Sequence, residues 1–272
     1  MANATPPNIK MGSPERFGYS WEISSKILDI HKDQFDQWVA ALPEDQWKDV
    51  RFLDVGCGIG RNSHWAMKRG AAGGIAIDVD DRTLEQARKN LAPYPETEVR
   101  WLSVYDIPFE NEFDLAFSIG VIHHLENPEL AVRRMVQATK PGGKVLVWLY
   151  GRENNGWIVH LFNPVRRILF SRLPLSVVNS LAWPLTGILW IMLRLAWGNL
   201  PYHDLLRRTG FEHLKHIVLD HMIPRITLYY RKHGAEELLQ QAGLSDIRSV
   251  WVNKMSWSVV GTKPSGRSHH NS

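Results

Sequence analysis

Three glycines follow a short apolar stretch and could let the backbone approach a bound ligand. Gly56, Gly58 and Gly60 come directly after residues 50–55. Because glycine has no Cβ, the chain can turn sharply here and a ligand can lie close to the main chain. A dinucleotide-binding fingerprint needs its third glycine one residue later. That position is Arg61, so the spacing argues against a nicotinamide oxidoreductase.

Three acidic residues mark the ends of successive predicted strands. Asp54 precedes the glycine turn, Asp78 lies near the end of residues 74–79, and Asp106 follows residues 99–104. The Asp78 carboxylate can accept hydrogen bonds from both hydroxyls of a ribose, and Asp106 could accept one from an adenine amine. Each acid taken alone would more often be a helix cap or a loop residue. Together, at the edge where open α/β sheets bind ligands, they predict a nucleoside site.

Histidines and tyrosines supply the candidates for proton transfer. His123 and His124 follow the predicted strand 113–119, and a histidine can take a proton from a hydroxyl near neutral pH. The alternative interpretation is that one histidine packs beneath the ligand and the other caps the next helix. His221 and Tyr229 are further candidates, farther along the chain.

Two other histidines, His213 and His216, are spaced to share one face of a helix. Without a suitable third ligand they would make a poor metal site. We therefore expect a solvated helix face here, and no metal.

The elements that must position these residues alternate between strands and helices. Such alternation is typical of βαβ units and a parallel sheet. The alternation stops at Gly151 and resumes near the C-terminus, where a short turn joins the last two strands, which should therefore pair antiparallel. The predicted strands are residues 50–55, 74–79, 99–104, 113–119, 144–149, 247–252 and 256–261, and the predicted helices are 63–69, 81–90, 128–139 and 235–242.

The N-terminal part is harder to interpret. Residues 1–14 are polar and contain three prolines, so we expect no fixed structure there. From Trp21 to Leu42 the apolar positions approximate a single helical stripe.

The middle segment, residues 151–233, differs in composition from the rest of the chain. It contains eleven Lys or Arg residues against four Asp or Glu residues. Residues 173–193 carry no formal charge, and Trp183, Trp190 and Trp197 recur at sevenfold spacing. Three interpretations remain open: a substrate-binding cap, a contact with a membrane surface, or a membrane span.

The overall composition sets the remaining bounds. A length of 272 residues suits one α/β domain with an elaboration, and 44% hydrophobic residues suffice for a core. The single cysteine, Cys57, excludes a disulfide framework and favours a reduced, cytoplasmic setting. No secretory signal is predicted at the N-terminus. The net charge of +4 is weak evidence for a nucleic-acid partner.

The glycine turn, the strand-end acids and two further runs resemble the class I S-adenosylmethionine-dependent methyltransferases of the small-molecule type. The resemblance covers residues 53–61, Asp78, Asp106, residues 113–125, which end in His123-His124-Leu125, and residues 140–143. It implies a Rossmann-like α/β fold: a seven-stranded, mostly parallel sheet with an antiparallel last strand, here with a helical insert. The implied cofactor is S-adenosyl-L-methionine, and the implied product is S-adenosyl-L-homocysteine.

The resemblance also implies roles for individual residues and a division of the chain. Asp78 would bind the ribose, Asp106 the adenine, Gly56 and Gly58 would lie beneath the methionine, and Asp54 would lie near its amino group. The run at 16–21 resembles a segment that covers the cofactor. The expected division is residues 1–20 covering the cofactor, 21–150 and 234–264 as the methyltransferase domain, and 151–233 as the cap. The full set of expected cofactor contacts is Tyr19, Asp54, Gly56, Cys57, Gly58, Gly60, Asp78, Val79, Asp106, Ile107, Ile119 and His124.

We therefore expect methyl transfer to a small apolar or amphipathic acceptor in a biosynthetic pathway. Such a transfer needs mainly alignment in a dry site, with a base where the acceptor must lose a proton. A cytoplasmic protein is expected, with membrane-surface contact through residues 157–197 as one option. The alternatives are a membrane-associated cofactor-binding protein without catalysis, and a nucleic-acid methyltransferase. The latter is disfavoured because residues 118–121 read Ser-Ile-Gly-Val rather than Asn-Pro-Pro-aromatic.

Overall fold

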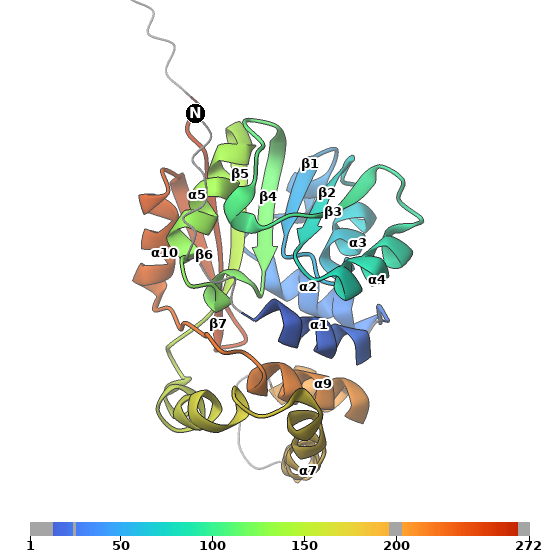
Figure 1. Ribbon diagram of the computed structural model, residues 1–272. Coiled ribbons are helices and arrows are strands. Elements are labelled where there is room, and N and C mark those ends of the chain that lie inside the picture. Colours follow the sequence, from blue (N-terminus) through green and yellow to red (C-terminus); the bar gives the residue numbers. More distant parts are fainter. Residues whose placement is uncertain (1–12, 24–25, 196–202, 266–272) are drawn as a thin grey trace, which may run out of the picture.

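A central sheet of seven strands organises the molecule (Figure 1). The computed structural model describes residues 13–23, 26–195 and 203–265. The strand order is β3-β2-β1-β4-β5-β7-β6, and only β7 runs antiparallel to its neighbours. The predicted Rossmann-like architecture is thus confirmed. The strands are β1 (Arg51–Val55), β2 (Gly73–Asp78), β3 (Thr97–Trp101), β4 (Phe113–Ile119), β5 (Thr139–Tyr150), β6 (Ser245–Val252) and β7 (Ser256–Thr262).

Helices cover both faces of the sheet. Helices α5 (Pro128–Ala138) and α10 (Lys232–Gln241) bury apolar side chains against one face. Helices α2 (Ile30–Trp38) and α3 (Arg61–Lys68) contribute to the core on the other face. Helix α4 (Asp81–Leu91) packs on the β2–β3 part of the sheet through Leu84, Ala87 and Leu91. The result is a three-layer core with the carboxyl ends of the parallel strands left open at one edge.

Two boundaries differ from the sequence-based expectation. Strand β3 ends at Trp101, and Val104–Asp106 form a 3₁₀ turn instead of continuing the strand. Strand β5 begins at Thr139, so residues 140–143 extend the strand instead of preceding it. An irregularity in the β4–β5 pairing between Phe113 and Leu115 accommodates the glycines there.

The N-terminal prediction of one helix from Trp21 to Leu42 was wrong. Helix α1 (Pro14–Ile23) ends before α2 begins, and it starts at a proline that was expected to lie outside regular structure. Its buried residues are Arg16, Gly18 and Ser20, so it has no apolar stripe to detect. Helix α1 also runs across the boundary expected at residue 20.

The insert folds as helices at the carboxyl edge of the sheet (Figure 1). Residues 158–170 form an irregular helical segment with wide turns, followed by α7 (Leu175–Arg194), α8 (His203–Arg208) and α9 (Phe211–Met222). Helix α7 packs against α9 through a small apolar cluster that includes Val178, Ala182 and Leu219. Trp197 lies outside the described residues.

Candidate active site

A cavity lies between the carboxyl edge of the sheet, helix α1 and helix α9. Its walls come from three parts of the chain that are far apart in the sequence. The sheet contributes the glycine turn and the ends of β2 and β4, α1 contributes one side, and the insert contributes the roof. Of the expected site residues, those that line the cavity are Gly56, Cys57, Gly58, Asp78, Val79, Ile119, His124, His221 and Tyr229.

The glycine turn has a conformation that other residues would not adopt at low cost. Gly56 has a φ of 73°, and a Cβ there would lie 2.4 Å from a methyl of Val121. The Asp78 carboxylate accepts hydrogen bonds from the backbone N–H groups of Gly58 (2.9 Å) and Val79 (2.7 Å). These bonds hold the carboxylate at the end of β2, on the wall of the cavity.

Asp54 lies behind the turn, fully buried and outside the cavity wall. Its Oδ2 accepts a hydrogen bond of 2.6 Å from the Ser63 hydroxyl, while Oδ1 has no partner among the described residues. Burial, with a smaller contribution from the charge of Asp78, raises the pKa of Asp54 to about 7. An unpartnered buried carboxylate oxygen next to the turn suits a ligand that brings a cation.

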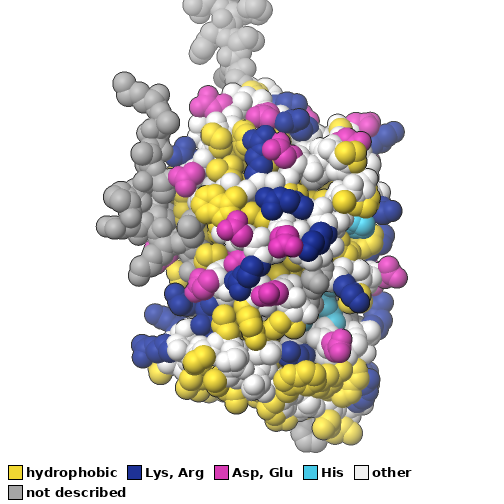
Figure 2. Space-filling model, turned by 45° about the vertical axis from the view of Figure 1, so that its right-hand side comes forward, with side chains coloured by type: hydrophobic (Ala, Val, Ile, Leu, Met, Phe, Trp, Pro, Cys, Tyr) yellow, Lys and Arg dark blue, Asp and Glu magenta, His cyan; other side chains and the backbone are white. Residues whose placement is uncertain are grey.

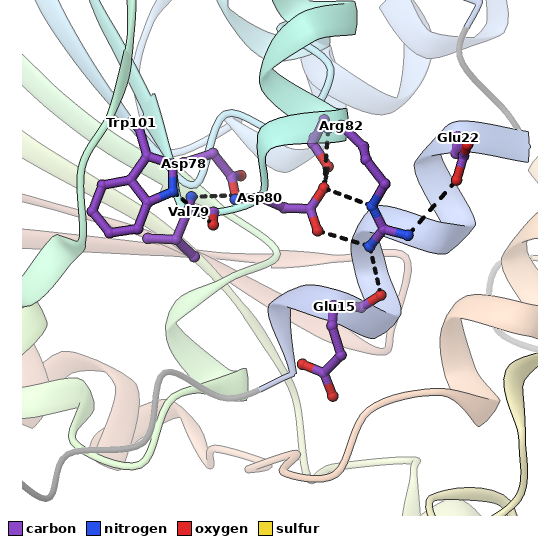
Figure 3. Close-up of polar contacts among 8 residues, drawn as sticks. Glu15, Glu22, Asp78, Val79, Asp80, Arg82 and Trp101 are labelled. Atoms are coloured by element: carbon purple, nitrogen blue, oxygen red, sulfur yellow. Dashed lines mark hydrogen bonds and ion pairs between the residues drawn. The ribbon is translucent and has the colours of Figure 1, made fainter.

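Arg82 of α4 binds residues of α1 and so holds this helix over the same end of the cavity (Figure 3). The Arg82 guanidinium donates to the Glu15 carbonyl (2.9 Å) and to Asp80 Oδ2 (2.8 Å), and it approaches Glu22 at 3.7 Å. Gly18 packs directly on Asp80, where a Cβ would lie 2.2 Å from the carboxylate. Close contact between the two helices therefore depends on glycine at position 18.

The opposite end of the cavity is lined by rings. His124 lies with its Nδ1 2.8 Å from the Ile226 carbonyl, which fixes the tautomer with the proton on Nδ1 and leaves a lone pair on Nε2. His221 is held in the same way by the Ile217 carbonyl at 2.9 Å. Its ring stacks on Tyr150 with centroids 5.7 Å apart. Both histidines line the cavity.

Burial keeps these groups uncharged. It lowers the pKa of His124 to about 3, with a further lowering from the charge of Arg166. The pKa of His221 is lowered and that of Tyr229 is raised, in both cases mainly by burial. The rings can therefore act as hydrogen-bonding groups at neutral pH without a net charge.

The expectation of a solvated face at His213 and His216 was wrong. Both residues are buried and line the cavity, because α1 and α2 pack over that face of α9. Ser20 of α1 donates to Asp220 at 2.6 Å and lies 3.2 Å from His216 Nδ1. Within the described ranges, no group of three or more His, Cys, Asp or Glu side chains is arranged to hold a metal ion.

Several predicted site residues lie elsewhere. His123 is completely buried and packs between His124 and Tyr150, with ring centroids 4.3 and 4.0 Å away. It lies outside the cavity wall, and burial lowers its pKa well below the usual value. Tyr19, Gly60 and Ile107 also lie outside the cavity wall; Gly60 begins α3 and Ile107 packs in the core.

Asp106 is exposed at the end of the 3₁₀ turn, outside the cavity wall. The prediction that it meets an adenine is therefore not supported by its position. Ser103 and Val104 line the cavity instead. Strand β3 ends three residues earlier than expected. For this reason the residues that follow β3 and face the cavity come earlier in the sequence than Asp106.

Comparisons with known proteins bear on the family and the fold of the chain. Residues 53–147 match a family model described as a methyltransferase domain. Curated relatives include a tRNA U34 carboxymethyltransferase of Pseudoalteromonas atlantica, 29% identical over 41% of this chain and 35% of the relative. Another is a ubiquinone biosynthesis O-methyltransferase of Bordetella avium, 28% identical over 57% of this chain and 68% of the relative. The chain spans 24% to 43% of the length of four such relatives, the one of Pseudoalteromonas atlantica included, so the resemblance concerns one domain.

Solved structures with the same fold cover more of the chain. An S-adenosylmethionine-dependent methyltransferase of Thermotoga maritima is 14% identical and aligns over 91% of this chain and 99% of its own, with a TM-score of 0.52. An O-methyltransferase family protein of Burkholderia thailandensis is 12% identical and aligns over 94% of this chain and 60% of its own, with a TM-score of 0.57. At these identities the likeness concerns the fold.

Proposed function

We propose that this chain, whose residues 53–147 are a class I S-adenosylmethionine-dependent methyltransferase domain, methylates a small apolar or amphipathic acceptor held beneath the insert. The product of the cofactor would be S-adenosylhomocysteine. The observation that carries the proposal is the cavity itself. It joins the glycine turn and Asp78 at one end to His124, Tyr150 and His221 at the other.

The cofactor end has the features that this ligand needs. The glycine turn leaves room where a Cβ would intrude, and Asp78 presents a carboxylate for the ribose hydroxyls. The unpartnered Oδ1 of Asp54 lies behind the turn, suited to a positive amino group. When bound, S-adenosylmethionine supplies a methyl group on a sulfonium, which is already a good leaving group.

The acceptor end is suited to holding and orienting a hydroxyl. His124 and His221 each use Nδ1 for a backbone carbonyl and have a lone pair left on Nε2. Either nitrogen could accept a hydrogen bond from an acceptor O–H and receive its proton as the methyl group is transferred. Since a pKa of about 3 makes His124 a weak base, alignment in a closed site would supply most of the acceleration.

The apolar character of the acceptor is supported by the rest of the wall. Trp38, Trp148 and Ile158 line the cavity around the histidines and tyrosines, and among the described lysines and arginines Arg61 alone lines it. A nucleic-acid acceptor would need a basic approach to the cavity. Although one relative is named as a tRNA-modifying enzyme, the exposed large side chains of residues 157–195 are mainly apolar.

Asp78→Ala tests the cofactor assignment by calorimetry with S-adenosylmethionine and S-adenosylhomocysteine. Affinity should fall at least tenfold, which corresponds to about 1.4 kcal/mol. Asp81→Ala, at an exposed acid three residues away that lies outside the cavity wall, is the matched control and should bind as the wild type does. Unchanged affinity in a folded Asp78→Ala protein would contradict the assignment.

Turnover to S-adenosylhomocysteine distinguishes an enzyme from a cofactor-binding protein without catalysis. Lipophilic phenols and quinols should be methylated in preference to polar acceptors of similar size. Cofactor binding without turnover on any acceptor of either class would favour the non-catalytic alternative.

A further inference from the structure

The outer surface of the insert is unusually apolar. Seventeen large apolar side chains of the described residues are exposed, and thirteen of them lie between Trp157 and Leu195. Leu161 is 70% exposed, Ile168 67% and Trp157 61%, and on α7 Ile188 and Ile191 are each 58% exposed. Figure 2 shows apolar side chains gathered at the lower end of the molecule, where the insert lies. We refer to the exposed apolar side chains of residues 157–195 as the insert face.

Helix α7 is arranged so that one side is fixed on the protein and the rest is free. Its buried residues, Val178, Ala182, Thr186 and Leu193, follow one helical stripe that packs toward α9. The helix is long and apolar enough to cross a membrane. Its contact with α9, however, holds it against the rest of the insert. A helix in this position can lie in the plane of a bilayer surface.

The charged side chains within residues 157–195 are all basic. No Asp or Glu occurs between Glu153 and Asp204. Arg167, Arg172 and Arg194 are exposed beside the apolar side chains, and the Arg194 guanidinium lies 3.3 Å from the ring centre of Trp190. Arginines and tryptophans at the border of an apolar face are typical of helices at a lipid interface.

We propose that the insert face docks on the surface of an anionic lipid bilayer. The apolar side chains would enter the boundary between headgroups and acyl chains, while the arginines would pair with anionic headgroups. A second copy of the chain fits less well. In a two-fold contact this face would meet itself, so the arginines of both copies would share one interface with no acid from this segment to offset them.

Docking would also bring the acceptor cavity close to lipid. Ile158 is buried and lines the cavity, and the helical segment that it begins exposes Leu161, Val165 and Ile168 on its outside. One segment of chain would therefore contact both the acceptor and the bilayer. The inference itself does not depend on methyl transfer, because binding to lipid can be measured without cofactor.

The test is sedimentation of the purified full chain with vesicles of phosphatidylcholine, with and without phosphatidylglycerol. The protein should bind the anionic vesicles at least tenfold more tightly, and added salt should weaken the binding because it screens the arginines. Leu161→Glu combined with Ile168→Glu should reduce binding at least tenfold. Both side chains are largely exposed, so the fold should be preserved, which circular dichroism and cofactor affinity can verify.

Two control variants separate the apolar contribution from the charge. Ile23→Glu combined with Leu28→Glu adds the same charge at exposed apolar positions outside the insert, and vesicle binding should change less than threefold. Arg167→Gln combined with Arg172→Gln should remove most of the preference for anionic vesicles. Absence of binding to either vesicle by the wild-type chain would overturn the proposal. So would a dimer in solution that dissociates in the Leu161→Glu, Ile168→Glu variant while the wild type ignores vesicles.

Discussion

Asp54 combines complete burial with a carboxylate oxygen that has no partner among the described residues. Its pKa of about 7 means that the free protein holds it about half protonated at neutral pH. A positive amino group bound nearby would favour the ionised form. Cofactor affinity should therefore rise between pH 6 and pH 8 in the wild type and stay nearly flat in Asp54→Asn. Calorimetry across that range measures it, and a parallel rise in both proteins would contradict the role.

The same carboxyl group affects the stability of the free protein. Between pH 4 and pH 7 the folded state holds a proton on Asp54 that the unfolded chain has lost, so the contribution of Asp54 to the unfolding free energy falls as pH rises through this window. The total change is on the order of 4 kcal/mol. In Asp54→Asn, the unfolding free energy measured with urea should not show this decrease between pH 5 and pH 7.

His124 should matter for turnover more than for cofactor binding. His124→Ala removes a ring that lines the cavity beside Tyr150, so turnover should fall at least tenfold while cofactor affinity changes less than threefold. Since its pKa is about 3, the wild-type pH profile should show no loss of rate above pH 5 from protonation of His124. His233→Ala, at an exposed histidine on α10, is the matched control.

The position of a single residue could be predicted from the sequence where that residue lies next to the end of a strand. Asp78 and the glycine turn follow strands whose apolar runs are unambiguous, so their position on the cavity wall could be predicted. Ser103 was missed because β3 stops at Trp101 while the apolar pattern continues to Val104. His213 and His216 were misjudged because their burial is caused by α1 and α2, more than 170 residues earlier in the chain.

At the scale of elements, α1 and α4 are held at a distance that only glycine permits. Ala in place of a helical Gly normally stabilises a protein by up to about 1 kcal/mol. At Gly18 the new methyl would meet Asp80, whose carboxylate is fixed by Arg82 and Thr83. Gly18→Ala should therefore displace α1 and weaken cofactor binding at least fivefold, as calorimetry can show.

Gly234→Ala is the matched control for that substitution. The site lies in α10, and a Cβ there would meet only Tyr230, at an ordinary contact distance of 4.0 Å. This variant should keep cofactor affinity and gain up to about 1 kcal/mol in stability. Equal affinity in both variants would mean that α1 does not help to hold the cofactor.

Strands β1, β2, β4 and β5 could be predicted because each contains a short apolar run. The sequence indicates that the insert is helical and amphipathic. It does not indicate which surfaces of the protein the helices of the insert pack against. Helix α1 escaped prediction because it is anchored by polar contacts: Arg16 donates to the carbonyls of Ile223 (2.7 Å) and Phe170 (2.9 Å). No periodic apolar pattern records such bonds.

For the molecule as a whole, the buried histidines predict sensitivity to acid. Burial lowers the pKa of His31 to about 2, of His124 to about 3 and of His213 to about 4, and His123 is also lowered. Below pH 6.5 the unfolded chain takes up protons that the folded state does not, so stability is lost as pH falls. Each histidine adds about 1.4 kcal/mol per pH unit to this loss.

Four such histidines outweigh Asp54, which acts in the opposite direction between pH 4 and pH 7. Denaturant unfolding should therefore show a marked loss of stability from pH 6.5 to pH 5. In His213→Gln, the unfolding free energy should depend less steeply on pH, by the equivalent of about one bound proton. Replacing the exposed His233 should leave the slope unchanged. A stability that is flat over this range would contradict the neutral, buried state of these rings.

The bonds of Arg16 have a consequence for the timing of the reaction cycle. Through them α1, which lines the cofactor end of the cavity, is tied to two parts of the insert: Phe170, where the irregular helical segment ends, and Ile223, at the C-terminus of α9. Because of these bonds, α1 and the insert would have to move together. We expect exchange of spent cofactor and release of the methylated acceptor to share a single opening step. If the insert is docked on a bilayer, its contact with lipid would determine how often the insert and α1 move away from the cavity.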